Sequence, residues 1–520
     1  MIVKENPQTA GIPILSRAGS RPPLRSGKGP SAGAVSLPSR TRNGGARRAS
    51  QNFQNTLIAL ARPASSQVYE DHFVRKRLEE FLGRSLGRNL TAHYITQADN
   101  CLYQRGNLRK PTELDWFLQN EMDIARSLGD TESLLFHLDV EYVNFDIPGQ
   151  AFPDPHRAFE LQQPVITTID TLLYGWGIKP LHILTGQGHH FVWRIPRVSP
   201  LAAEIASLSP APELLEPCTE RIPHEICPER DMEGQRAFGA VALLMEFVAH
   251  RVRAAAARHS SLPVEMTAVH VGPCHAGQRE IISIDISEYG DPLHARMVRM
   301  PFTRYRKALA QGASLWAVPV DGMTTAQSLE IRGNGAAVAD LAHRASGAIP
   351  DQTPGTERLL SAYEASALCC FHKEFYSSKH DPPSIWSQTY DRTPLDFLPH
   401  CARHILTCPN DRLLKPAGIQ IVTRSLLAQG WHPRHIAGLI RSKFADSSYS
   451  WGIDWNDYEP GTRADFYVRL FAGLYATGLD QLVDMNCVST AEKGFCFQYP
   501  GICPGLEKER HNLLSRKYPL

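Results

Sequence analysis

The chain of 520 residues is 42% hydrophobic and 21% charged, a balance typical of a soluble globular protein with two or three domains. It has no apolar run of about 18 residues and no N-terminal secretory signal, so we expect neither a membrane segment nor export. Its eleven cysteines, an odd number, favour metal or cluster ligation over a disulfide framework.

Residues 1–50 carry nine Lys and Arg side chains against one acid, Glu5, and are rich in Gly, Ser and Pro. The net charge of the whole chain is +2, so the other residues together hold a net charge of −6. This composition predicts a disordered basic arm over residues 1–60. A tail that binds nucleic acid phosphates and a solvated extension without a function fit the arm equally well.

After the arm, a helical pattern begins near Ser66 and continues to Leu86. Mixed strand and helix patterns follow as far as about Leu341. We therefore expect an α+β domain over residues 66–345.

A stretch rich in Pro, Ser, Thr and Gly at residues 346–356 indicates a boundary. Residues 346–397 are expected to form a partly helical connector. The last region, residues 398–510, is predicted to be mostly α-helical, because apolar residues recur at three- and four-residue spacing. Its expected helices cover residues 417–429, 433–443 and 464–477.

An acidic strand is the first candidate site. Leu134–Tyr142 has the pattern of a buried strand, and alternation places Asp139 and Glu141 on one face with His137. The two carboxylates repel each other unless divalent cations such as Mg²⁺ or Mn²⁺ neutralise them, and such cations bind phosphates. The alternative is a pair of solvent-facing acids at the end of a strand.

A glycine turn is the second candidate site. Two apolar stretches within Leu181–Ile195 flank Thr185, Gly186, Gln187 and Gly188, and the adjacent pair His189 and His190 follows at once. Glycines there allow positive φ and let backbone amides approach phosphate oxygens closely. The alternative is an ordinary hairpin with a surface histidine pair.

A third acid, Asp285, lies in the apolar strand pattern Ile281–Ile286. It leads into Met297–Lys307, which is unusually basic beside an acidic domain. The basic side chains can bind nucleotide phosphates or a template backbone, or can simply be solvated charges. They are Arg299, Arg304, Arg306 and Lys307.

The order of these motifs over Leu134–Lys307 resembles the archaeo-eukaryotic primase superfamily. The Asp-x-Glu pair is similar to the form used by primase-polymerases, and Thr185 stands where that family usually has Ser. Asp139 and Glu141 look like the first motif, His190 the second and Asp285 the third. Arg299 and Lys307 fall where the family has basic residues that contact phosphates.

The resemblance implies an α+β catalytic domain with an RRM-like core. It also implies the activity of a primase, which joins NTPs or dNTPs on a single-stranded DNA template. It implies two Mg²⁺ or Mn²⁺ ions held by three catalytic acids, Asp139, Glu141 and Asp285. The implied nucleotide-binding residues are Thr185, Gly186, Gly188, His190, Arg299 and Lys307. The implied partners are a single-stranded DNA template, nucleoside triphosphates and a replicative helicase or other replication proteins, in the cytoplasm with the nucleoid or a mobile element.

The helical region has a second resemblance, over Leu398–Pro504, to the iron–sulfur domain of the primase large subunit. In that domain one cysteine precedes the helices and three follow them. The matching residues imply a [4Fe–4S] cluster on Cys401, Cys487, Cys496 and Cys503. Cys408 is an alternative first ligand, and a Zn(Cys)₄ site is an alternative to the cluster.

Other candidate ligands are left open by the sequence. Five basic residues of the helical region are either template contacts or the polar faces of ordinary helices; they are Arg424, Arg434, His435, Arg441 and Lys443. Cys218, His224 and Cys227 match no firm zinc spacing, so we expect them to be unligated.

Two rival functions belong to other classes. A rolling-circle nickase needs two histidines that face the same way, whereas His189 and His190 are adjacent and should face opposite ways on a strand. A catalytically inactive nucleic-acid-binding subunit is the non-enzymatic rival, and the intact trio of acids argues against it.

Overall fold

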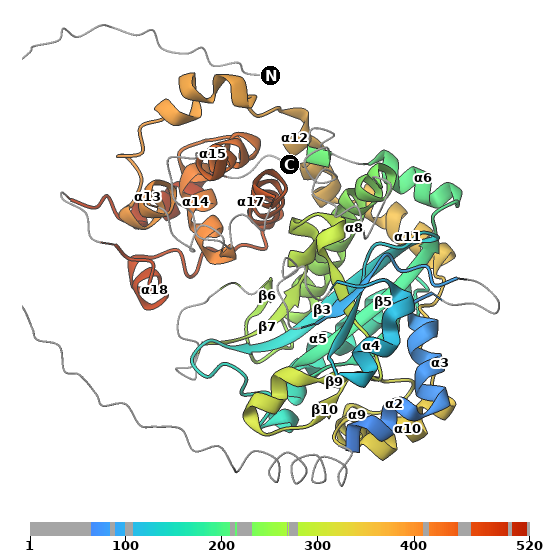
Figure 1. Ribbon diagram of the computed structural model, residues 1–520. Helices are drawn as coiled ribbons and strands as arrows, with labels where there is room; N and C mark the ends of the chain where they lie inside the picture. The colour runs from blue at the N-terminus through green and yellow to red at the C-terminus, as the bar shows by residue number, and fades with distance from the viewer. Residues whose placement is uncertain are drawn as a thin grey trace, which may run out of the picture. The chain divides into compact units, whose positions relative to one another are not determined.

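The computed structural model describes residues 64–83, 89–98, 108–208, 214–215, 231–267, 269, 279–408, 415–445, 459–497 and 502–516 (Figure 1). The expected basic arm and the group Cys218, His224 and Cys227 lie outside the described residues. The chain from Arg62 to Leu520 forms one compact unit. None of the helices in the described ranges combines the length and apolar character needed to cross a membrane.

The first helical pattern forms two helices, not the single one that its periodicity predicts. They are α2 (Ala64–Glu70) and α3 (His72–Phe81). Asp71 interrupts them because its side chain accepts hydrogen bonds from the backbone N–H groups of Phe73 and Val74, which caps the start of α3.

A six-stranded sheet forms the centre of the mixed α/β region. Its strand order is β11-β4-β5-β3-β7-β6, and each neighbouring pair is antiparallel except β6 and β7. The strands are β3 (Ser133–Asn144), β4 (Leu181–Leu184), β5 (Gly188–Pro196), β6 (Val264–Met266), β7 (Glu280–Asp285) and β11 (Val318–Pro319). The long strand β3 therefore lies between β5 and β7, where it is protected from solvent on both edges.

Two long helices cover one face of this sheet. Helix α5 (Pro155–Gly175) connects β3 to β4, helix α8 (Met232–Ala256) lies between β5 and β7 in the chain, and both contact β3 (Figure 1). Phe159 of α5 packs on His189, whose strand partner is Val140, so the apolar residues of β3 face the helices. The alternating residues of β3 therefore face the other way.

Smaller elements carry the basic stretch that follows β7. Strands β1 (Ile95–Gln97), β2 (Ile124–Ser127) and β8 (Met297–Arg299) form an antiparallel sheet in that order. Strands β9 (Arg304–Tyr305) and β10 (Leu315–Trp316) form a short pair, and η6 (Arg306–Gln311) lies between them.

The expected connector contains helices α11 (Thr353–Glu364) and α12 (Ala367–Ser377) and two short turns, η7 (Pro383–Gln388) and η8 (Tyr390–Arg392). Helix α11 contacts β5 and α8, and α12 contacts helix α17 (Pro460–Ala476). The domain boundaries at residues 345 and 398 stay predictions.

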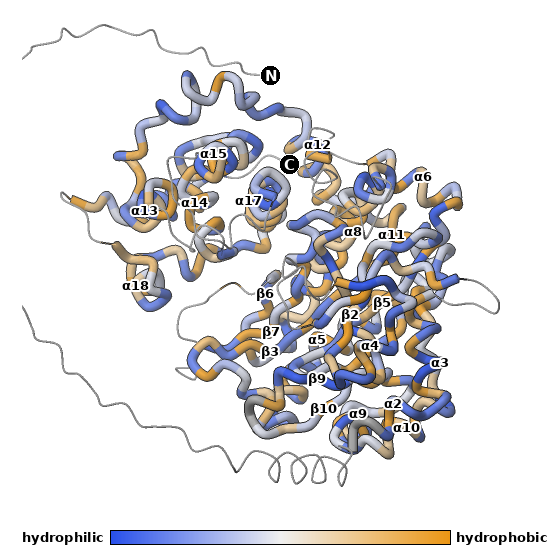
Figure 2. Tube along the Cα trace, in the orientation of Figure 1, coloured by the Kyte–Doolittle hydropathy of each residue, from blue (hydrophilic) through white to orange (hydrophobic). Residues whose placement is uncertain are grey.

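The C-terminal region is helical, as its periodicity predicts. It contains α13 (His400–Thr407), α14 (Pro416–Ala428), α15 (Pro433–Ala445), α17 (Pro460–Ala476), α18 (Cys487–Glu492) and α19 (Glu507–Ser515). Helix α17 packs between α14 and α15, and it also contacts the short helix η4 (Ser287–Gly290) that follows β7. Figure 2 shows apolar residues along the strands and helices of the interior with hydrophilic residues between them.

Candidate functional site

Three strands bring the expected acids and the histidine together. Asp139 of β3 lies directly opposite Asp285 of β7 on one side and His190 of β5 on the other. Directly opposed residues of antiparallel strands point to the same face, so the three side chains meet there. Glu141 lies two residues further along β3 and points the same way. The register thus collects the first, second and third motifs on the face that α5 and α8 leave uncovered.

The acids lie close enough to disturb each other's ionisation. Burial raises the pKa of Asp139 well above its usual value, and the charges of Glu141 and Asp285 raise it further. Burial and the charge of Asp285 also raise the pKa of Glu141. The positive charge of Lys307 opposes this rise but does not cancel it. Ionised together, these carboxylates repel one another.

One carboxylate oxygen in this group is left without a partner. Within the described residues, the buried Oδ1 of Asp139 accepts no hydrogen bond, and the Nε2 of His190 lies 3.4 Å from it. No three His, Cys, Asp or Glu side chains of the described ranges are already arranged as a ligand set around one point. A buried carboxylate oxygen without a donor, beside two more carboxylates, has the donor chemistry of a hard divalent cation site.

The two adjacent histidines face opposite sides of the sheet, as expected. Burial and the neighbouring His137 lower the pKa of His190 well below its usual value, so its imidazole is neutral at physiological pH. The Nδ1 of His189 lies 2.8 Å from the Nε2 of His182, on the side of α5. His189 and His190 therefore do not belong to one site.

Sequence reasoning missed the residues that support the acidic face. The Nδ1 of His137 lies 2.7 Å from a carboxylate oxygen of Glu288, and both side chains are buried. The hydroxyl of Tyr289 accepts from the backbone N–H of His137 and donates to its carbonyl, at 3.1 and 2.9 Å. Strand β7 pairs with β3 only from Asp139 onward, so Tyr289 replaces the missing strand partner. The sequence placed His137 on this face, but the only signal for Glu288 and Tyr289 was their position shortly after Asp285.

The glycine turn needs its glycines for a different reason than expected. Gly186 and Gly188 do not use the positive φ that glycine allows. A Cβ on Gly188 would lie 1.8 Å from the carbonyl oxygen of Val140, and one on Gly186 would lie 2.4 Å from the ring of Tyr305. Close approach of neighbouring groups, and not backbone handedness, therefore selects glycine.

Thr185 closes this turn. Its backbone N–H and its hydroxyl both donate to the carbonyl oxygen of Gly188, at 2.8 and 3.1 Å. The hydroxyl is buried and is therefore occupied within the turn.

The basic stretch after β7 divides into paired and exposed residues. Arg299 forms an ion pair with the buried Asp123 and lies 4.2 Å over the ring of Tyr305. Arg304 pairs with Glu121 at 2.9 Å, whereas Arg306 and Lys307 are exposed. Arg299 and Lys307 both lower the pKa of Glu141, so their charges reach the acids.

Three of the four expected cluster cysteines interact electrostatically, although in the described ranges they do not form a ready ligand set. Cys401 is buried near the start of α13, and the backbone N–H of His400 lies 3.5 Å from the Sγ of Cys503. Burial raises the pKa of Cys401 to about 12, and the thiols of Cys503 and Cys487 add to the rise. Cys408 lies at the opposite end of α13, about 10 Å away at the helical rise per residue.

Cys496 is exposed, and its neighbour Phe497 stacks on His404 of α13 with ring centroids 3.7 Å apart. The segment that carries Cys496 therefore also lies against α13.

The basic candidates of the helical region are largely structural. Arg424 pairs with Asp480 and Asp484, and Arg434 pairs with Asp465, with both guanidinium groups buried. The others also contact the protein: Lys443 lies 3.4 Å from Asp391, the Nδ1 of His435 lies 2.9 Å from the hydroxyl of Tyr390, and Arg441 lies 5.7 Å over Trp386. The interpretation as polar helix faces fits these contacts better than template binding.

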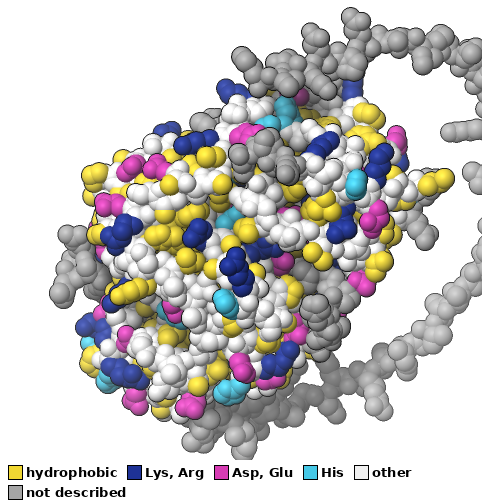
Figure 3. Space-filling view, turned by 180° about the vertical axis from the view of Figure 1, so that it is seen from behind, with side chains coloured by type: hydrophobic (Ala, Val, Ile, Leu, Met, Phe, Trp, Pro, Cys, Tyr) yellow, Lys and Arg dark blue, Asp and Glu magenta, His cyan; other side chains and the backbone are white. Residues whose placement is uncertain are grey.

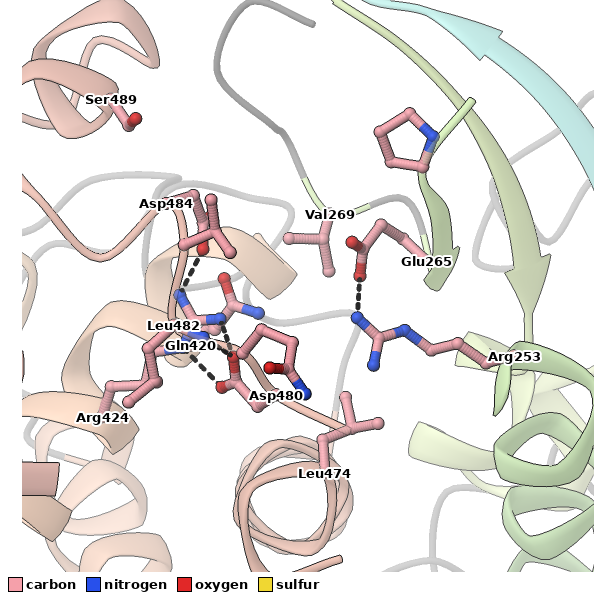
Figure 4. Close-up of a pocket in the computed structure, with 13 residues that line it drawn as sticks. Arg253, Glu265, Val269, Gln420, Arg424, Leu474, Asp480, Leu482, Asp484 and Ser489 are labelled. Atoms are coloured by element: carbon pink, nitrogen blue, oxygen red, sulfur yellow. Dashed lines mark hydrogen bonds and ion pairs between the residues drawn. The ribbon is translucent and has the colours of Figure 1, made fainter. Parts of the chain in front are cut away.

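A cavity of about 340 Å³ is lined by none of Asp139, Glu141 and Asp285 (Figure 4). Arg253 and Glu265 approach it from α8 and β6, and Arg424 and Asp480 approach it from the helical region. Arg253 pairs with Glu265, and Arg424 pairs with Asp480 and with Asp484, a third acid that lines the cavity, so both arginines already have carboxylate partners.

No protein-family model matches the chain, and searches of curated proteins and of solved structures find no match either. The functional argument therefore rests on the acids, the neutral histidine and the exposed lysine of this face. Together they have the chemistry to bind divalent cations and phosphates.

Proposed function

We propose that the chain is a template-directed nucleotidyltransferase of the primase-polymerase type, which joins nucleoside triphosphates on single-stranded DNA. The observation that carries the proposal is the register that puts Asp139 between His190 and Asp285, with Glu141 beside them. The order β-α-β-β-α-β of the main elements from β3 to β7 and the strand order β4-β5-β3-β7 support a ferredoxin-like or RRM-like core. The resemblance implies this core, with the acids on its open face.

The acidic face fits two divalent cations, Mg²⁺ or Mn²⁺. Asp139, Glu141 and Asp285 would hold them, and the unpartnered Oδ1 of Asp139 supports this assignment. Bound there, the cations would lower the pKa of the attacking 3′-hydroxyl and stabilise charge on the pyrophosphate leaving group. The neutral imidazole of His190 is available to donate one hydrogen bond to a phosphate oxygen, and Lys307 supplies a positive charge.

The helical region would carry a [4Fe–4S] cluster, with zinc as the alternative metal. The proximity of Cys401, Cys487 and Cys503 supports a shared metal site, and it favours Cys401 over Cys408 as the first ligand. Cys496 is included on the resemblance alone. The helical region is further proposed to engage the template and the first nucleotide.

The test of the activity uses the full-length chain with a single-stranded DNA template, labelled NTPs or dNTPs, and Mg²⁺ or Mn²⁺. Wild type should make product, and the double variant Asp139→Asn/Glu141→Gln should make none. Asp115→Asn, an acid-to-amide change at an exposed position, is the matched control and should keep activity. Nicking without synthesis would replace the proposal with a nickase, and binding without either reaction would replace it with an inactive subunit.

The test of the cluster is anaerobic purification with chemical determination of iron, acid-labile sulfide and zinc. Wild type should be brown and contain iron and sulfide. Cys487→Ser should lose them, whereas Cys408→Ser should keep them. A colourless wild-type protein with stoichiometric zinc would establish the alternative metal.

A further inference from the structure

One buried arginine differs from all the others that the structure describes. Six arginines are buried in the described ranges, and five of them pair with a carboxylate. The five pairs are Arg126 with Asp130, Arg424 with Asp480, Arg434 with Asp465, Arg463 with Asp291 and Arg469 with Glu246. Arg332, which is 1% exposed, has no carboxylate partner among these residues. A buried charge without a counter-charge is unfavourable and calls for a specific reason.

The guanidinium of Arg332 binds the glycine turn. Arg332 is the last residue of helix α9 (Thr325–Arg332), and its Nη1 donates to the carbonyl oxygens of Thr185 and Gly186. The guanidinium lies 4.7 Å over the ring of Phe159. Within the described residues its Nη2 has no hydrogen-bond acceptor. Burial lowers the pKa of Arg332 to about 10, so the side chain is still charged at neutral pH.

The two carbonyls fix the direction of two N–H groups. In a trans peptide the C=O and the N–H point in opposite directions, so the N–H groups of Gly186 and Gln187 point away from Arg332. Both residues are buried, and in the described part of the chain neither N–H donates to any group. Buried N–H groups without an acceptor are rare in proteins, whereas a pair of them beside a positive charge is a site for an anion.

We propose that Arg332 is a positioning residue for an anion that binds the turn Thr185–Gly188, and that this anion is the triphosphate of the incoming nucleotide. Arg332 orients the N–H groups of Gly186 and Gln187 and supplies the positive potential that holds the anion there. The identity of the anion rests on the proposed function. The presence of the anion site rests on the geometry alone.

Steady-state synthesis by the full-length chain tests the role of Arg332. Arg332→Met should raise the KM for the nucleotide about tenfold or more while kcat falls less than about threefold. The reason is that the lost interaction stabilises the bound substrate and the transition state equally. Arg332→Lys keeps the charge but not the forked geometry of the guanidinium, so its KM should lie between those of wild type and Arg332→Met. Arg344→Met removes one exposed charge from the neighbouring helix α10 (Gly335–Arg344) and should change neither constant. An unchanged KM in a folded Arg332→Met overturns the inference and leaves the proposed function standing.

A second measurement uses inorganic triphosphate without nucleotide, template or metal. In wild type and Arg344→Met, it should slow amide hydrogen exchange in peptides that contain Gly186 and Gln187, and in Arg332→Met it should not. This result supports the anion site even if the wild type synthesises nothing, in which case only the proposed function fails. Absence of protection in the wild type overturns the inference, and this comparison remains decisive if Arg332→Met does not fold.

Discussion

At the scale of single residues, the acidic face brings together carboxylates whose joint ionisation is unfavourable. Asp139, Glu141 and Asp285 come from two strands whose register places them together, and their partial burial reduces the water that would screen them. A group of this kind is stabilised by cations and destabilised by its own ionisation, which gives it a characteristic dependence on pH.

In metal-free protein, the free energy of unfolding should fall as the pH rises past the usual carboxylate range. The folded state holds the proton of Asp139 more tightly than the unfolded chain, because its pKa is raised, so deprotonation favours unfolding. Asp139→Asn should therefore be more stable than wild type at neutral pH, by more than about 1 kcal/mol, and the difference should vanish in acid. Urea unfolding from pH 4 to 8 measures this. A difference that grows as the pH falls would contradict it, and adding Mg²⁺ should restore the stability of wild type alone.

Two glycines provide a test of close packing at the same scale. Gly188→Ala should destabilise the fold by more than about 2 kcal/mol, because its Cβ would lie 1.8 Å from a backbone oxygen that cannot move away cheaply. Gly239 lies inside α8, where an added Cβ would meet nothing within 4 Å, so Gly239→Ala should stabilise by about 0.5–1 kcal/mol. Thermal unfolding of both variants makes the comparison, and equal effects of the two changes would refute it.

At the scale of elements, helix α17 and the short helix η4 join the helical region to the acidic face. Arg463 of α17 lies 3.2 Å from Asp291, which directly follows η4, and Phe466 packs against Gly290. Helix η4 itself presents Glu288 to His137 and follows Asp285. The C-terminal helices thereby support the residues that position the acids.

Breaking the ion pair between these elements should strongly lower the free energy of unfolding. Arg463→Ala should lower the free energy of unfolding by about 3 kcal/mol, because it leaves the buried carboxylate of Asp291 with Arg296 alone. Arg403→Ala breaks an exposed pair with Asp396 in the same region and should cost less than about 1 kcal/mol. Denaturant unfolding of the two variants distinguishes a buried ion pair from an exposed one. Similar losses in both would contradict the assignment.

At the scale of the whole molecule, a buried ionic network links the sheet region, the connector and the helices. Glu246 of α8 contacts Arg469 of α17 at 2.9 Å and His372 of α12 at 3.2 Å. Surface charge is less organised: the described part of the face in Figure 3 mixes Lys and Arg with Asp and Glu and shows no broad patch of one sign.

The network should make stability sensitive to acid. Burial acts to raise the pKa of Glu246, but Arg469 and His372 outweigh it and lower the pKa to about 2. This stabilisation is present in full above the unfolded pKa of about 4.3 and is lost as the pH falls toward 2. Glu246→Gln should therefore be less stable than wild type by about 3 kcal/mol at pH 7, and by much less at pH 2. Unfolding curves at the two pH values measure this, and a constant difference would exclude the proposed linkage.

Features that depend on near neighbours in the chain could be predicted from the sequence. Alternation put Asp139 and Glu141 on one face of a strand and set His189 against His190, and periodicity located the C-terminal helices to within a few residues. Such patterns follow from the repeats of strands and helices, which need only a few residues of context. The break at Asp71 was missed, because capping competes with these repeats.

Contacts between distant residues could not be predicted in this way and became visible in the folded chain. The register of β7 on β3 placed Asp285 opposite Asp139, and the same fold brought Glu288 to His137 and Arg332 to the glycine turn. These contacts join segments far apart in the chain, and the register that produces them is fixed by burial of the whole apolar face. No local pattern encodes that choice, so the acidic pair was visible in the sequence while the residues that support it were not.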